Sequence, residues 1–80
     1  MKMRAKMHVI KVERHIGGTE VLHMSPVAKS GPYPADGSDE DNTFARFSPV
    51  GSLSLTIANP ALHGKFEPGK KYYVDFVPAE

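Results

Sequence analysis

Cysteine is absent from the 80 residues of this chain, and so is any apolar run of membrane-spanning length. Without cysteine there are no disulfides and no zinc site built on thiolates. A transmembrane helix needs about 20 mainly apolar residues, and the N-terminal segment also lacks the apolar core of a signal peptide. These absences fit a small domain that works in a reducing, aqueous compartment without contacting a membrane.

Strong charge of one sign is also missing, because 10 basic residues nearly balance 9 acidic ones and leave a net charge of +1. The basic residues concentrate in residues 1–14 and the acidic ones in residues 36–41. A protein that binds long nucleic acid non-specifically is normally far more basic, since its affinity depends on neutralising phosphates. We therefore expect no long nucleic-acid partner, whereas a small anionic ligand needs only one local basic site.

The length indicates a single domain over residues 1–80 that is small enough to need support. A chain of this size buries only about 60–65% of the surface of its unfolded state. Small domains usually gain stability from disulfides, a metal ion or a partner subunit. With disulfides excluded, we expect a homo-oligomer, either a dimer or a tetramer.

Alternation of apolar and polar residues predicts a long first strand over residues 3–14. The apolar phase slips by one residue at Val9–Ile10, which predicts a β-bulge there. The pair Gly17-Gly18 predicts a two-residue hairpin turn, because both positions tolerate positive φ, and a return strand over residues 19–27 follows.

The second half of the chain predicts further strands and one helical turn. Asn59-Pro60 has the residue types of a helix N-cap and a first helical position, and Glu67-Pro68-Gly69-Lys70 those of a type II turn. Residues 29–42 are rich in Gly, Pro, Ser and Asp and predict a flexible loop. Strands are predicted over residues 43–48, 52–58 and 71–77, the second with Leu53, Leu55 and Ile57 inward. The expected fold is mainly β, a small five-stranded antiparallel barrel or sandwich with at most one short helix.

Motifs of catalysis and metal binding are missing from the sequence. The acidic run has Gly37 in its second position, which breaks the calcium-loop pattern. There is no G-x-S-x-G elbow and no phosphate-binding glycine loop. The four histidines, His8, His15, His23 and His63, lack the spacing of metal ligands on a helix. No catalytic residue, metal or cofactor is predicted, and we expect a binding protein rather than an enzyme.

One segment combines aromatic rings with a cation, because Phe44 and Phe47 flank Arg46, with Asn42 and Ser48 close by. An aromatic ring can stack on a nucleobase, and arginine can hold a phosphate through two hydrogen bonds. The asparagine amide can read the edge of a base. The alternative interpretation is a half-buried strand with core phenylalanines and a surface arginine.

Three segments together resemble a widespread group of small tailed-phage proteins. They are residues 40–49 (EDNTFARFSP), 53–60 (LSLTIANP) and 66–76 (FEPGKKYYVDF), and residues 3–7 (MRAKM) fit the opening strand of that group. The chain also resembles the anti-CBASS sponge proteins. These homo-oligomers sequester the cyclic nucleotide signals of bacterial antiphage defence without cleaving them.

The resemblance implies a phage immune-evasion protein in the cytoplasm of the infected bacterial host. Its ligand is expected to be a cyclic dinucleotide or a related cyclic nucleotide signal. A single-stranded nucleic-acid-binding barrel, a protein-interaction module of a phage and an enzyme that degrades the signal stay open as alternatives. The implied ligand contacts are Asn42, Phe44, Arg46, Phe47 and Ser48, with Asn59 and Tyr72 as weaker additions.

Overall fold

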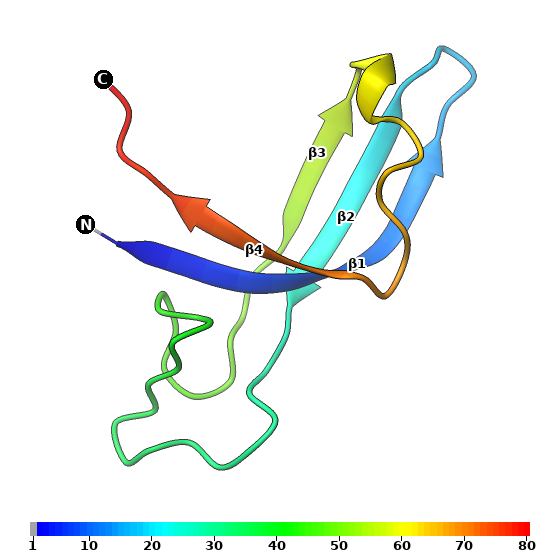
Figure 1. Ribbon diagram of the computed structural model, residues 1–80. Coiled ribbons are helices and arrows are strands. Elements are labelled where there is room, and N and C mark those ends of the chain that lie inside the picture. Colours follow the sequence, from blue (N-terminus) through cyan, green and yellow to red (C-terminus); the bar gives the residue numbers. More distant parts are fainter. Residues whose placement is uncertain (1) are drawn as a thin grey trace.

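The computed structural model describes residues 2–80 as one antiparallel sheet of four strands in the spatial order β3-β2-β1-β4 (Figure 1). The sheet curls into a half-barrel, which confirms the mainly β antiparallel fold. The elements are β1 (Met3–Arg14), β2 (Glu20–Pro26), β3 (Leu53–Ile57), a single 3₁₀ turn η1 (Pro60–Leu62) and β4 (Lys71–Phe76).

β1 serves two neighbours along its length. Its first half pairs with β4, and its residues from Met7 onwards pair with β2. The pairing with β2 shifts between Val9 and Lys11, which confirms the predicted bulge and keeps Val9 and Val12 on the core side. A bulge bends its strand, and the bend of β1 between its two partners is visible in Figure 1.

The hydrophobic core is small and lies on one face of the curled sheet. Leu55, which the alternation predicted to point inward, is instead 52% exposed at the middle of β3. A core of this size gives the protein a small free energy of unfolding, so the hydrogen bonds of a single buried polar group are a large part of it. The buried apolar residues are Ala5, Met7, Val9, Leu22 and Met24, and Val12, Leu53, Ile57, Phe66, Tyr72 and Val74 pack against them.

The turn before β4 is confirmed, whereas the hairpin turn lies where it was predicted but is wider: the N–H of His15 donates to the carbonyl of Thr19 at 2.9 Å, so residues 16–18 form the loop and Gly17 lacks a positive φ. Gly18 closes the β1–β2 hairpin with φ of +89°, and Gly69 precedes β4 with φ of +91°. Asn59 caps η1, because its Oδ1 accepts a hydrogen bond of 3.1 Å from the N–H of Ala61. These are the positions where the chain needs left-handed backbone or a side-chain acceptor.

The predicted strand over residues 43–48 is wrong, because these residues form turns and bends in the structure. β1 extends beyond β2, and the chain around Asn42 binds the edge that is left. The N–H of Thr43 donates to the carbonyl of Arg4 at 3.0 Å, and Asn42 Oδ1 accepts from the N–H of Lys6 at 2.9 Å. Side-chain hydrogen bonds replace part of a strand ladder here, as short polar side chains can do.

Candidate functional site

Asn42 holds the long connection between β2 and β3 against the sheet through hydrogen bonds of its side chain. Its side chain is buried, and its Nδ2 donates to the carbonyl of Val27 at 2.8 Å and to Asp39 Oδ2 at 3.2 Å. Its Oδ1 accepts from the N–H of Lys6. The amide that was expected to read a ligand is therefore engaged by the protein's own backbone, and Asn42 positions the loop around it.

Phe47 lies on this loop in an unusual backbone conformation. Its φ is +57°, in the left-handed region that an aromatic residue rarely adopts. The N–H of Phe47 donates to the carbonyl of Gly37 at 2.8 Å, and its ring meets the ring of Tyr33 edge-on at 5.9 Å between centroids. These contacts hold a ring that remains 51% exposed.

The other predicted contacts of this segment are close to Phe47 in the sequence. Phe44, Arg46 and Ser48 are exposed, and we call residues 44–48 the aromatic loop. The remaining two predicted contacts serve the fold elsewhere. Asn59 caps η1, and Tyr72 packs on the core face with its ring 5.2 Å from that of Phe66.

A cluster of ion pairs joins β1, β4 and the loop before Asn42. Arg4 binds Asp75 through two hydrogen bonds, at 2.7 and 3.1 Å, and its guanidinium lies 4.2 Å from the ring centre of Tyr73. The hydroxyl of Tyr73 donates to Asp41 at 2.9 Å, which lowers the pKa of Asp41 and raises that of Tyr73. The bond from Arg4 likewise lowers the pKa of Asp75. The cluster links the sheet to the loop and leaves these acids paired.

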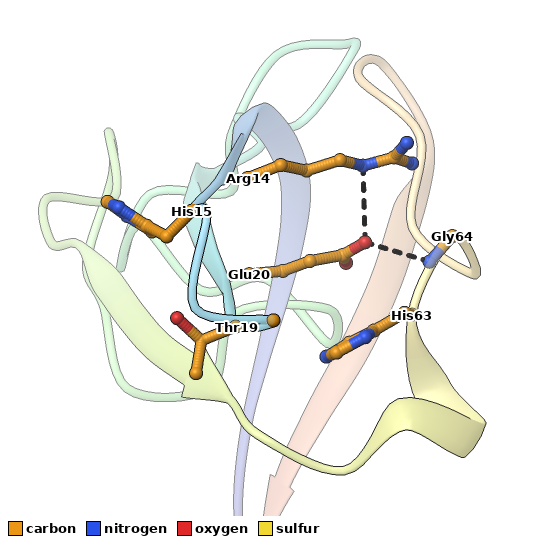
Figure 2. Close-up of a pocket in the computed structure, with 7 residues that line it drawn as sticks. Arg14, His15, Thr19, Glu20, His63 and Gly64 are labelled. Carbon is orange, nitrogen blue, oxygen red and sulfur yellow. Dashed lines mark hydrogen bonds and ion pairs between the residues drawn. The ribbon is translucent and has the colours of Figure 1, made fainter.

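A second polar site lies around the turn of the β1–β2 hairpin, where the chain after η1 packs against it (Figure 2). We call this cavity of about 350 Å³ the hairpin pocket. Figure 2 shows the carboxylate of Glu20 between the guanidinium of Arg14 and the ring of His63 in this view. The pocket is lined by Arg14, His15, Gly18, Thr19, Glu20, His63 and Gly64.

Glu20 is the buried acid of this pocket, with only 3% of its surface exposed. Its Oε1 accepts from the N–H of Gly64 at 3.0 Å and lies 3.3 Å from Nε of Arg14. Its Oε2 is buried and has no hydrogen-bond partner among residues 2–80. A buried acceptor without a donor costs free energy, so this oxygen is an exception that calls for an explanation.

His63 and Arg14 complete the chemistry of the pocket. His63 Nε2 lies 2.9 Å from the carbonyl of Ile57, and because a carbonyl only accepts, this nitrogen carries the hydrogen. In the neutral ring Nδ1 is then a free acceptor. The Arg14 side chain is 71% exposed and pairs with Glu20 through Nε, so its terminal N–H groups face solvent.

The sequence contained a signal for this site that the motif search missed. β2 buries Leu22 and Met24, and the period of two places Glu20 on the same face. An acid in register with the core residues of its strand is either paired or functional.

No group of three or more histidine, aspartate or glutamate residues that could hold a metal ion occurs in the chain from residue 2 to 80. Over the same range no helix is long and apolar enough to cross a membrane. Comparison of the sequence with protein-family models and with curated proteins, and of the fold with solved structures, finds no similar protein.

Proposed function

We propose that the protein is a sponge that binds a cyclic nucleotide signal of bacterial antiphage defence and sequesters it without cleaving it, inside a cell infected by a phage. The observation that carries this proposal is the aromatic loop. Phe44, Arg46 and Phe47 are exposed there on a segment that Asn42 ties to β1. The resemblance of this segment to phage sponge proteins supplies the class of ligand.

The loop has the chemistry that a nucleotide requires. A base stacked on an aromatic ring contributes about 1–3 kcal/mol, and an arginine side chain can hold a phosphate through two charge-assisted hydrogen bonds. Phe47 is held in place by its hydrogen bond to Gly37 and by Tyr33, so little side-chain order has to be gained on binding. Sequestration needs this binding surface and no general base.

Tight sequestration favours a homo-oligomer. Silencing a micromolar signal requires a dissociation constant near the nanomolar range, about −12 kcal/mol. One exposed loop with two rings and one arginine is a small surface for that affinity. A second copy adds contact surface beyond that of one loop, and this extra surface is the reason to expect an oligomer.

The outer edge of β3 is the place where a second copy fits. This strand, Leu53–Ile57, has no charge, proline or bulge, the features that normally protect an exposed edge, and no other strand of residues 2–80 pairs with it there. Antiparallel pairing about a two-fold axis at Leu55 sets Leu53 opposite Ile57 and Ser54 opposite Thr56 of the other copy. The pairing covers the exposed side chain of Leu55.

Charges placed on this edge test the pairing and its register. The double variant Ser54→Lys/Thr56→Lys puts like charges opposite each other and should sediment as a monomer. The double variant Ser54→Lys/Thr56→Glu puts a lysine opposite a glutamate twice and should keep the wild-type mass. Identical masses for both variants in sedimentation equilibrium would show that the subunits do not meet at β3.

Retention of ligand tests the sponge itself. The purified protein is incubated with a panel of cyclic dinucleotides, cyclic trinucleotides and cyclic ADP-ribose-type signals, freed of unbound ligand and heat-denatured. Mass spectrometry of the supernatant should then find one signal intact. Arg46→Ala should lose that signal, whereas Lys65→Ala, an exposed cation after η1, should retain it.

Each other result of this experiment contradicts the proposal in a distinct way. Fragments of a signal in the supernatant would identify an enzyme. A signal that Arg46→Ala retains as well as the wild type would place the site elsewhere. If no signal is retained, the protein is not a sponge, and single-stranded oligonucleotides and protein partners become the ligands to test.

A further inference from the structure

Glu20 Oε2 is the one buried side-chain nitrogen or oxygen within residues 2–80 that lacks a hydrogen-bond partner. Its carboxylate already faces one backbone N–H, from Gly64, and the cation of Arg14. A carboxylate oxygen can accept two hydrogen bonds, and this one accepts none from the described residues. A marginally stable small domain that keeps such an acceptor in a pocket has an unused binding group there.

The groups inside the pocket define what can fill it. Glu20 Oε2 accepts hydrogen bonds, and so does Nδ1 of a neutral His63, whose Nε2 is bound to the carbonyl of Ile57. Both inner groups therefore require donors from the ligand. Arg14 at the exposed rim instead offers N–H donors and a positive charge, which suits a phosphate.

We propose that the hairpin pocket binds a guanine nucleotide. The Watson–Crick edge of guanine presents two adjacent donors, N1–H and the N2 amino group, beside the acceptor O6, and the pocket offers two acceptors, on Glu20 and His63. Arg14 at the rim is the group proposed to bind the phosphate. Adenine presents a donor beside an acceptor nitrogen, and that nitrogen would face a lone pair of the pocket. The guanidinium of free arginine has a similar donor edge, but it would add a second cation beside Arg14.

The pocket can admit such a ligand. Its volume of about 350 Å³ is within the range of small-molecule sites. Oε2 has almost no exposed surface, so a base edge reaches it only if the wall of the pocket moves; Arg14, which is largely exposed and held by one ion pair to Oε1, is free to move. Along β1, Arg14 lies roughly 30 Å from Arg4, beside which the aromatic loop is attached. The pocket is therefore a separate site that goes beyond the sponge proposal.

A titration of ¹⁵N-labelled protein tests the proposal with known probes. Addition of 5′-GMP should shift the amide signals of Gly18, Thr19 and Gly64, and AMP should bind at least about tenfold more weakly. Glu20→Gln replaces Oε2 by a donor and should weaken GMP by about tenfold or more. Glu13→Gln, a change to a half-exposed acid on β1, should leave GMP binding unchanged.

A second variant keeps the test independent of folding at Glu20. Arg14→Ala removes an exposed side chain and should weaken GMP binding without weakening the binding of guanosine, which has no phosphate. Absence of shifts with millimolar GMP, equal binding of AMP, or a preference for L-arginine over GMP would each overturn the proposal. Because the retention experiment uses the aromatic loop and Arg46→Ala, either site can fail without the other.

Discussion

Asn42 and Glu20 are the two buried polar residues of residues 2–80, at 1% and 3% exposure, yet their surroundings differ. Asn42 makes three side-chain hydrogen bonds, two of them to backbone groups of β1 and of the chain after β2. Glu20 has partners for one oxygen and none for the other among the described residues. The two residues are therefore equally buried but have opposite roles. Asn42 has its hydrogen-bonding groups satisfied by the protein, whereas Glu20 keeps one acceptor oxygen without a donor.

The difference follows from the chemistry of the two side chains. An amide offers both a donor and an acceptor, which is what the unpaired edge of a strand presents, so Asn42 can replace a missing strand partner. A carboxylate only accepts, and the turn around Gly64 supplies one N–H to it. The second oxygen of Glu20 then depends on a donor that the described chain lacks.

Substitutions at Asn42 and Glu20 are expected to give the largest difference between the two residues. Asn42→Ala leaves the N–H of Lys6 and the carbonyl of Val27 without partners and should lower the free energy of unfolding by about 3 kcal/mol. Glu20→Gln keeps the acceptor for the N–H of Gly64 and should change the free energy of unfolding by less than about 1 kcal/mol. Urea denaturation followed by circular dichroism measures both. Asn59→Ala, the loss of an exposed cap, is the control and should cost less than about 1 kcal/mol.

The opposite order of the two losses in stability would contradict the roles assigned to Asn42 and Glu20. If Glu20→Gln destabilises the protein more than Asn42→Ala does, the carboxylate is the structural group and the pocket is a part of the core. Equal and small losses would instead show that the loop is held by Asp41, through Tyr73 and Lys6, rather than by Asn42.

The sheet could be predicted because its determinants are local. The alternation in β1, its slip at Val9–Ile10 and the turns at Gly18 and Gly69 each depend on residues close in the sequence. The strand over 43–48 was wrong because Asn42 and Thr43 bind β1, about 40 residues away in the chain, through side-chain groups. Pattern reading assumes that such a segment pairs through a continuous backbone ladder, whereas here side-chain hydrogen bonds stand beside a single backbone bond from Thr43 to Arg4.

The aromatic loop and the hairpin pocket differ in the same way in how far the sequence reveals them. The residues of the aromatic loop were selected from the sequence because Phe44, Arg46 and Phe47 are close together in it, whereas their loop conformation was not predicted and their binding role stays a prediction. The hairpin pocket joins Glu20 to His63 and Gly64, which lie far along the chain and meet through the pairing of β2 with β3. That contact depends on register, and no spacing motif marks it.

Two glycines, one at each site, give the finest test of the comparison. Gly37 and Gly18 both have positive φ, +74° and +89°, so alanine at either position should cost about 1 kcal/mol in backbone strain. A Cβ at Gly37 would also lie 2.6 Å from the ring of Phe47, whereas nothing lies within 4 Å of one at Gly18. Gly37→Ala should therefore lose about 2 kcal/mol in thermal or urea unfolding.

The two alanine variants should also separate in binding. Gly37→Ala displaces Phe47 and should weaken retention of the cyclic nucleotide, while Gly18→Ala should retain it as the wild type does. Equal losses of stability would mean that both the ring and the backbone nitrogen of Phe47, which lie 2.6 and 2.8 Å from the added Cβ, move away from Gly37 without strain. The aromatic loop would then be loosely held. Its rings would not be rigidly positioned, and this difference from the hairpin pocket would disappear.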